Sequence, residues 1–205
     1  AAGGADSALA GAVAATGSSQ KRRYKMVYMM LADGFEEAEA ICPLDVLIRA
    51  GADVKTVSVG DRLTVTGTHG IEIKADMLLR DIPDERPEMI VLPGGMPGAS
   101  NLNSCDPLKN MLLDLNAHGG FIGAICAAPF ILGEMDLLVG KEAICYPGFE
   151  KSLRGAKISG KQVVRDQYII TAAGMGVAIE FGYELAYALK GKEAADLVMT
   201  RILKS

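Results

Sequence analysis

A cysteine stands where an apolar strand is predicted to turn into a helix. Cys126 ends the run GFIGAIC at residues 120–126 and is followed by AAPF at residues 127–130. A sharp turn from strand to helix strains the backbone of its junction residue and points that side chain out of the fold. The positions two before and two after the junction come close together, and both are small here, Ala124 and Ala128. The pattern therefore predicts a nucleophile displayed at an elbow.

The same turn is expected to make the Cys126 thiol reactive. The first amides of the following helix point towards the sulfur, and the helix dipole favours negative charge there. A thiol in that place is expected to ionise more readily than a free cysteine. The alternative is a cysteine that simply packs, because free cysteine is among the most commonly buried residues. Cys126 alone does not separate these two interpretations.

Two other strand-to-helix turns are expected at the same edge of the sheet. In an open parallel sheet, ligands bind outside the carboxyl ends of the strands. The turn LPGGMPG at residues 92–98 can bring bare backbone amides close to an anion or a developing oxyanion. A phosphate cradle is the rival interpretation, but neither GxxxxGK[ST] nor GxGxxG is present. The turn by itself indicates only a tight bend.

The remaining turn, DGFEEAE at residues 33–39, supplies carboxylates. Glu36, Glu37 and Glu39 open a predicted helix, where acidic residues are stabilising and are usually solvated. One carboxyl group directed towards Cys126 would nevertheless make chemical sense. Burial and the like charge of a thiolate would raise its pKa, so that it stays protonated and donates a hydrogen bond to the sulfur. That proton could later serve a substrate.

Neither histidine is convincingly placed as the base that a cysteine nucleophile usually has. His118 closes a predicted helix on the far side of the elbow strand and is typical of a helix-end cation or polar cap. His69 lies in a hairpin-like turn and is expected to reach a site only across a subunit boundary. A proteolytic Cys–His dyad is therefore disfavoured.

Composition narrows the class of protein. The 205 residues are half apolar, enough for one domain with a sizeable core. A net charge of −4 without a cluster of basic and aromatic residues argues against nucleic acid, and no apolar run approaches the roughly 18 residues of a membrane span. Four cysteines without a CxxC pair and only two histidines argue against a metal site. We expect a reducing, cytoplasmic compartment.

Residues 1–23 are predicted to be a flexible tail rich in Ala, Gly and Ser, and residues 24–205 to be a single domain. The tail lacks acidic residues except Asp6 and ends in basic residues, so it could be the remnant of an organellar targeting segment or a simple extension.

From Lys25 onwards, short apolar runs alternate with helical stretches, which predicts an α/β fold with a mostly parallel sheet covered on both faces. Strands are predicted at residues 26–31, 54–59, 89–92, 121–126, 143–145 and 168–172. Helices are predicted at residues 36–50, 106–118, 127–134, 177–189 and 192–203. Extended segments at residues 63–66, 71–74 and 163–165 are expected to form hairpins or edges.

Taken together, the turns resemble the ThiJ/PfpI superfamily, in the branch that contains the parkinsonism-associated protein deglycase. The resemblance runs from about residue 25 to residue 203. Its most specific pieces are GFEEAE at 34–39 with PLD at 43–45, VLPGG at 91–95, AICAAP at 124–129, and TAAGMG at 171–176 continuing to Glu180-Phe181.

The resemblance implies a flavodoxin-like three-layer sandwich and a homodimer with active sites near the interface. It makes Cys126 the nucleophile and oxidation-sensitive thiol, and Glu39 the carboxylic acid that touches it. It also implies that Gly94, Gly95 and Ala127 form an anion pocket. Tyr146, Gly174 and Met175 are expected to line the site, and Arg49 and His69 to face the partner subunit.

The chain departs from the family pattern in two places. Many relatives have histidine where this chain has Tyr146, and proline where it has Met175. Protease-like relatives place histidine directly after the cysteine, whereas Ala127 follows here. Glu39 is therefore the main candidate for acid and base.

The resemblance predicts a cofactor-free enzyme that acts on α-oxoaldehydes such as methylglyoxal, or on their adducts with amines and thiols. A different class is also consistent with the same thiol: a redox sensor or stress chaperone switched by oxidation of Cys126. A thiamine-pathway or peptidase activity is suggested only by names used within the superfamily.

Overall fold

The computed structural model describes residues 26–204, so the tail predicted for residues 1–23 lies outside the described part. A seven-stranded sheet runs through the centre, in the order β10-β11-β7-β6-β1-β2-β5. Every neighbouring pair is parallel except β10 and β11. The strands are β1 (Met26–Leu31), β2 (Asp53–Ser58), β5 (Met77–Leu78), β6 (Met89–Leu92), β7 (Phe121–Ile125), β10 (Val163–Asp166) and β11 (Ile169–Ala172).

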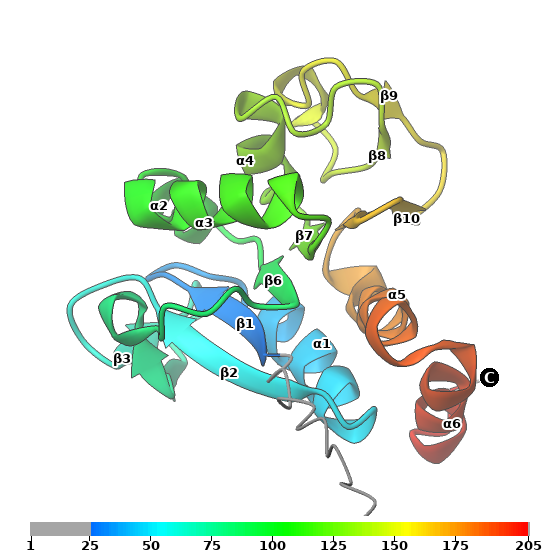
Figure 1. Cartoon of the computed structure of the whole chain (residues 1–205), viewed down its shortest axis with the longest axis horizontal. Helices are drawn as coiled ribbons and strands as arrows, with labels where there is room; N and C mark the ends of the chain where they lie inside the picture. The colour runs from blue at the N-terminus through cyan, green and yellow to red at the C-terminus, as the bar shows by residue number, and fades with distance from the viewer. Residues whose placement is uncertain (1–25, 205) are drawn as a thin grey trace, which may run out of the picture.

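Helices cover both faces of this sheet, as predicted for a flavodoxin-like sandwich (Figure 1). On one face lie α2 (Gly98–Asn103), α3 (Asp106–Ala117) and α4 (Pro129–Glu134). On the other lie α1 (Glu37–Arg49), α5 (Ala178–Lys190) and α6 (Lys192–Arg201). None of the helices within residues 26–204 combines the length and the apolar character that crossing a membrane requires.

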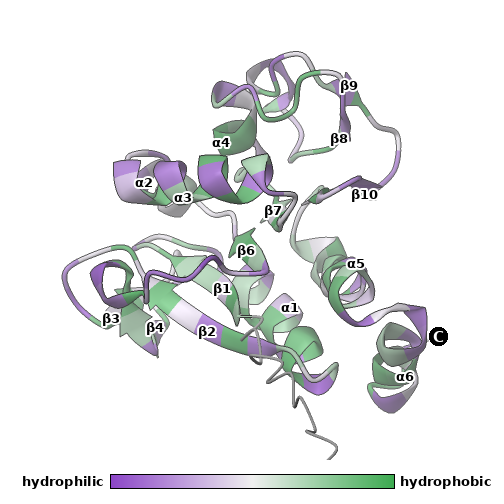
Figure 2. Cartoon of the chain, viewed as in Figure 1, coloured by the Kyte–Doolittle hydropathy of each residue, from purple (hydrophilic) through white to green (hydrophobic). Residues whose placement is uncertain are grey.

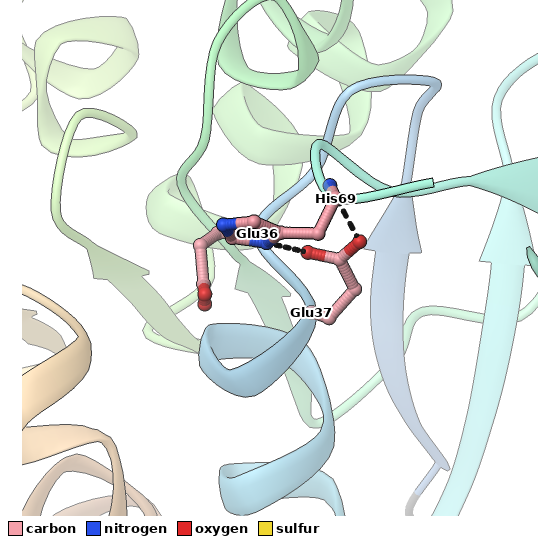
Figure 3. A group of neighbouring side chains, drawn as sticks. All are labelled: Glu36, Glu37 and His69. Atoms are coloured by element: carbon pink, nitrogen blue, oxygen red, sulfur yellow. Dashed lines mark hydrogen bonds and ion pairs between the residues drawn. The ribbon is translucent and has the colours of Figure 1, made fainter. Parts of the chain in front are cut away.

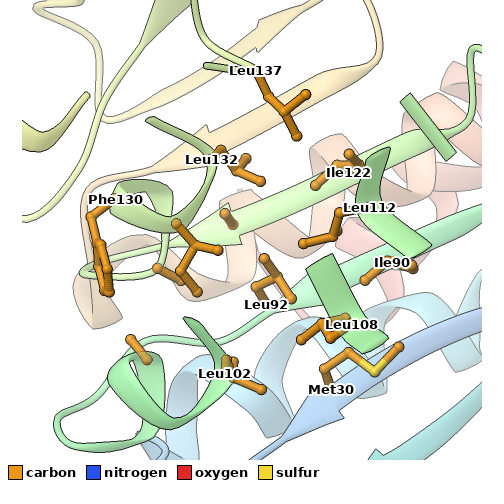
Figure 4. Packing of buried hydrophobic residues seen from close by; sticks show 14 of the residues in the cluster. Met30, Ile90, Leu92, Leu102, Leu108, Leu112, Ile122, Phe130, Leu132 and Leu137 are labelled. Atoms are coloured by element: carbon orange, nitrogen blue, oxygen red, sulfur yellow. The ribbon is translucent and has the colours of Figure 1, made fainter. Parts of the chain in front are cut away.

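Two apolar clusters, one on each face, hold the layers together. Along β1, Tyr28 and Met30 pack into one cluster while Met29 and Leu31 pack into the other. Side chains of a strand alternate between faces, so a strand covered on both sides reads as a continuous apolar run. Figure 2 shows the neighbouring strand β6 in green, and Figure 4 shows the cluster beneath α2, α3 and α4.

Short elements complete the chain. The hairpin predicted from residues 63–66 and 71–74 is confirmed as β3 (Thr64–Thr66) paired antiparallel with β4 (Glu72–Lys74). A second small sheet pairs β8 (Glu142–Ala143) with β9 (Lys157–Ile158). Three 3-10 turns lie at Leu79–Asp81, Glu150–Ser152 and Met175–Val177.

Most predicted elements are present, and the differences have local causes. The predicted strand at residues 143–145 shrinks to β8, which pairs with β9 and not with the central sheet. The helix predicted from residue 127 begins at Pro129, which suits a first helical position because it needs no amide donor there. Helix α2 was not predicted, since its six residues, GASNLN, are too few to show apolar periodicity and four of them, Gly, Ser and two Asn, are poor helix formers.

The topology brings the turns singled out in the sequence to one edge. Strands β1, β6, β7 and β11 are neighbours and parallel, so their carboxyl ends lie side by side. The segments that follow them contain Glu39, Gly95, Cys126 and Met175, respectively. Helix α1, which bears Glu39, is held close to α5: a side chain at Gly182 would meet Pro43 Cα at 2.9 Å.

Candidate active site

Cys126 occupies the predicted elbow. Its φ of 63° lies in the left-handed region, which costs a non-glycine residue about 1 kcal/mol or more. Backbone bonds hold it there: its N–H donates to Ala172 O at 2.9 Å, and its carbonyl accepts from Tyr146 N–H at 2.8 Å. Ala128 N–H closes the turn onto Ile125 O at 3.1 Å. The strain is thus imposed by the end of β11 and by the segment that contains Tyr146, and Cys126 as a residue is only partly buried.

Glu39 is almost fully buried, with 1% of its surface exposed, and its carboxyl group is hydrogen-bonded to the Cys126 side chain. Two backbone amides also donate to this carboxyl: Gly94 N–H at 3.1 Å and Met175 N–H. Glu36 caps the start of α1, since its side chain accepts from Glu39 N–H at 2.6 Å. The carboxyl group therefore joins the three loops that follow β6, β7 and β11.

The backbone amides of Gly95 and Ala127 donate to the Cys126 sulfur. These are two of the three amides predicted for the anion pocket. Gly94, the third residue assigned to the pocket, donates its N–H to Glu39 at 3.1 Å. Its lack of a side chain matters for the geometry, because a Cβ there would collide with both Glu39 and Cys126.

The structure shifts both ionisable groups towards their protonated forms. Burial, followed by the charge of Glu36, raises the pKa of Glu39 to about 7, although bonds from Cys126, Gly94 and Met175 oppose this. Burial, followed by the charge of Glu39, raises the pKa of the Cys126 thiol to about 12, against the amides of Ala127 and Gly95. The raised pKa of Glu39 agrees with the sequence prediction. The readily ionised thiol predicted from the helix amides is wrong in direction.

The pair is best described as two groups that share protons. After burial, the negative charge of Glu39 is the next largest cause of the raised thiol pKa, and that charge disappears when the carboxyl group takes up a proton. A thiolate beside a neutral Glu39 then keeps the amides of Gly95 and Ala127 as its donors. The nucleophile can therefore form by proton transfer inside the pair, with no release of a proton to solvent.

The other residues predicted to line the site lie beside Glu39. A side chain at Gly174 would meet Tyr146 Cδ2 at 3.4 Å and Glu39 Oε1 at 3.9 Å. The Tyr146 ring and the Met175 side chain are 51% and 57% exposed, respectively. The loop after β11 and the segment after β8 thus form the outer rim of the site.

Arg49 and His69 lie away from the cysteine. Arg49 pairs with Asp45 at 2.6 Å near the far end of α1. His69 Nδ1 lies 2.7 Å from Glu37 Oε2, and its backbone N–H donates to Glu37 Oε1 at 2.8 Å (Figure 3). The imidazole was expected to act only across a subunit boundary, and here it is engaged within its own chain. His118 caps α3, as predicted, with Nδ1–H donating to Asp114 O at 2.8 Å.

Glu37 is buried, so the expectation of a solvated first-turn carboxylate is wrong for it as well as for Glu39. Burial alone would raise its pKa, but hydrogen bonds from His69 and neighbouring amides outweigh this and lower it. The ligand atoms of Glu36, Glu37 and His69 lie within 4.8 Å of one another, close enough for a cation. The Glu37 carboxylate already accepts from the imidazole, so the arrangement fits an ion pair better than a metal site.

The structure gives positioning roles to Glu36, which the sequence analysis named without one, and to Thr171, which it did not name. Glu36 caps α1 and its charge contributes to the raised pKa of Glu39. Thr171 is buried in β11, and its hydroxyl accepts from Ile144 N–H at 3.0 Å, which anchors the segment that leads to Tyr146. The sequence signal that could have pointed to Thr171 is that it is the only hydroxyl residue in the apolar strand IITA.

We expect Gly94→Ala to disable the site without unfolding the chain. A Cβ at this position would lie 2.5 Å from Glu39 Oε2 and 2.6 Å from Cys126 Cβ, so the pair must separate. A misplacement of that size can lower kcat/KM by about 100-fold. Gly176→Ala in the neighbouring loop is the control, because a Cβ there meets nothing within 4 Å. Equal activities of the two variants, with unchanged circular dichroism, would contradict this geometry.

The buried carboxyl group should make stability depend on pH. The pKa of Glu39 rises from 4.5 to about 7 on folding, so its contribution is fully present below pH 4.5 and is lost as pH rises through 7. Between about pH 5 and pH 8, we expect the free energy of unfolding of the wild type to fall by roughly 2 kcal/mol relative to Glu39→Gln. Urea unfolding of both proteins at each pH measures this difference. A difference independent of pH would mean that Glu39 ionises normally.

Comparison with known proteins places this site in a family. Residues 25–188 match the DJ-1/PfpI family. Protein DJ-1 homolog B of Arabidopsis thaliana is 41% identical over 185 residues, which are 89% of this chain and 42% of that protein. This chain therefore spans less than half the length of that relative.

A relative of similar length and a solved structure extend the comparison. Glutathione-independent glyoxalase DJR-1.2 of Caenorhabditis elegans is 32% identical over 165 residues, covering 80% of this chain and 88% of that protein. The solved structure of oxidized DJ-1 from Toxoplasma gondii has 35% sequence identity to this chain and a TM-score of 0.85. The match covers 88% of this chain and 98% of the Toxoplasma gondii chain. The resemblance predicted from the strand-end motifs is thereby confirmed. The chain, with its cysteine elbow after β7 and its buried glutamate in the helix after β1, belongs to the DJ-1/PfpI family.

Proposed function

We propose that the protein is a cofactor-free enzyme of the glyoxalase or deglycase type, with Cys126 as nucleophile. The observation that supports this most is the hydrogen bond between the Cys126 side chain and the buried Glu39 carboxyl group. The amides of Gly95 and Ala127 beside the sulfur add donors for a developing oxyanion. The name of the Caenorhabditis elegans relative, glutathione-independent glyoxalase, agrees with this assignment.

The proposed reaction begins when Glu39 takes the thiol proton and the Cys126 sulfur attacks the aldehyde carbon of methylglyoxal. The aldehyde oxygen becomes an alkoxide near the amides of Gly95 and Ala127, and it then takes up the proton as a hemithioacetal. Glu39 next moves a proton from that carbon to the adjacent carbonyl carbon, the hydroxyl proton passes to the former ketone oxygen, and a thioester of lactate results. Water hydrolyses the thioester, so the sum is methylglyoxal and water giving lactate. A pKa of about 7 lets Glu39 act as base and acid in turn.

The direct test is lactate formation from methylglyoxal by the purified protein, without glutathione and after treatment with a chelator. We expect enzymatic production of lactate at neutral pH and an excess of one enantiomer, because a shuttled proton is delivered to one face. Adducts of methylglyoxal with amines and thiols are then compared as substrates. Lactate at the uncatalysed rate, and as a racemate, would contradict the proposal.

A redox sensor or stress chaperone is the second candidate. The donors around the sulfur, Glu39 and the amides of Gly95 and Ala127, match the acceptor oxygens that a sulfinate would present. Two equivalents of hydrogen peroxide would oxidise the thiol to the sulfinic acid, each being reduced to water. Selective peroxide oxidation of Cys126, without any lactate formation, would favour this function over the enzyme.

We further propose a homodimer as the working assembly, in the cytoplasm. Helix α1 exposes Ile41 and Ile48 on one side, 42% and 54% accessible, two turns apart. We expect Ile48→Asp to convert the dimer to a monomer, because a charge on an apolar contact must be desolvated. Light scattering after size exclusion measures the mass. Leu197→Asp on α6, similarly exposed at 48%, is the control that should leave the assembly unchanged.

A further inference from the structure

Three exposed apolar side chains belong to the loops that form the site. Met96, Tyr146 and Met175 are 48%, 51% and 57% exposed. Isolated exposed apolar residues are common on protein surfaces and need no explanation by themselves. These three differ because each is attached to backbone that is bonded to the Cys126–Glu39 pair.

The attachments are specific. Gly95, directly before Met96, donates its N–H to the Cys126 sulfur. Tyr146 donates its own N–H to Cys126 O at 2.8 Å, and Met175 donates its own N–H to the Glu39 carboxyl group. The backbone at these three positions is therefore held beside the reacting pair. We call Met96, Tyr146 and Met175 the apolar collar.

The direction of the Tyr146 ring is known from its neighbour. The ring edge and Glu39 Oε1 both lie within 4 Å of the point where a Gly174 side chain would begin. The ring therefore stands beside the carboxyl group and does not turn away from the site. Tyr146 as a residue is 51% exposed, so it offers aromatic surface that a ligand can contact.

The chemistry of the collar indicates what it contacts. An aromatic ring and two thioethers offer apolar, polarisable surface and no positive charge. Glu36 and Glu39 bring two carboxyl groups to the site, which disfavour an anionic substituent. An uncharged alkyl or aryl group on the substrate fits this wall, whereas a carboxylate or phosphate does not.

We propose that the apolar collar binds the substituent of the α-oxoaldehyde, so that aryl and larger alkyl glyoxals are preferred over glyoxal itself. This inference rests on the proposed glyoxalase-type function and adds the substrate class to it. The substituent packs on the Tyr146 ring and the Met175 thioether while its aldehyde carbon meets the sulfur. Substituted glyoxals are then preferred because their substituent buries apolar surface against the collar, and glyoxal has no substituent.

The first experiment compares kcat/KM for glyoxal, methylglyoxal and phenylglyoxal in the wild type and variants. Tyr146→Ala should lower the value for phenylglyoxal about 10-fold more than the value for glyoxal, chiefly through KM. Tyr146→Phe should restore the ratio, because the ring and not the hydroxyl provides the wall. Tyr168→Ala is the matched control: it is 48% exposed, and its residue precedes β11 at the opposite end of the sheet. An equal loss for all three substrates would overturn the collar.

A second experiment needs no turnover. Iodoacetamide and N-benzyl iodoacetamide both alkylate Cys126 by forming a C–S bond with loss of iodide, and mass spectrometry of the Cys126 peptide follows each rate. In the wild type, N-benzyl iodoacetamide should react faster than iodoacetamide. Tyr146→Ala should reduce the ratio of the benzyl rate to the iodoacetamide rate about 10-fold. A reduced ratio without any oxoaldehyde turnover would reject the proposed function and keep the collar. Turnover with an unchanged ratio would reject the collar alone.

Discussion

Replacing Cys126 with serine is expected to lower kcat/KM for methylglyoxal by about 1,000-fold or more. Serine has nearly the same shape, so it can occupy the elbow at φ 63° and keep the backbone bonds to Ala172 and Tyr146. Its hydroxyl is a far weaker nucleophile than sulfur, and the Glu39 carboxyl group is too weak a base to ionise it. The fold should therefore persist while the thioester route is lost.

The control for this variant is Cys105→Ser. Cys105 is the N-cap of α3 and makes no capping hydrogen bond, so serine there should preserve activity and raise stability by about 0.5 kcal/mol or more. Lactate formation and urea unfolding measure both effects on the same samples. If Cys126→Ser and Cys105→Ser retained equal activity, Cys126 would not be the nucleophile, and another thiol or bound water would have to be sought.

Glu39→Gln is expected to lower kcat by about 100- to 10,000-fold, which is the usual contribution of a positioned general acid or base. Glutamine can still bond to Gly94 N–H, so the arrangement of the loops should be kept. It cannot take up the thiol proton or move a proton between two carbons. Glu193→Gln, on the exposed side of α6, is the control and should leave kcat unchanged.

The same variant separates proton transfer from tuning of the thiol. The charge of Glu39 contributes to the raised pKa of Cys126, so its removal should lower that pKa and speed alkylation by iodoacetamide near pH 8. We thus expect a thiol that reacts faster with iodoacetamide in an enzyme that turns over more slowly. If alkylation and kcat fell together, Glu39 would serve mainly to activate the sulfur, and the proton shuttle would be wrong.

The architecture and the position of the central cysteine could be predicted from the order of the amino acids. Apolar runs such as residues 26–31 and 89–92 specify buried parallel strands, because only a sheet covered on both faces buries both sides of a strand. The small residues Ala124 and Ala128 around Cys126 specify the elbow, since larger side chains would collide there. Local sterics and burial were sufficient for these conclusions.

The contacts within the site and the protonation of its groups depend on tertiary packing. The resemblance singled out Glu39, but the residues alone left Glu36, Glu37 and Glu39 as alternatives, and the structure places the Glu39 carboxyl group at the sulfur. The pKa of the Cys126 thiol is raised where the sequence predicted a lowered value. Burial and the charge of Glu39 raise it, and Glu39 lies about 90 residues away in the sequence. Sequence patterns report short-range geometry, whereas desolvation and charge–charge interactions depend on where the whole chain places its groups.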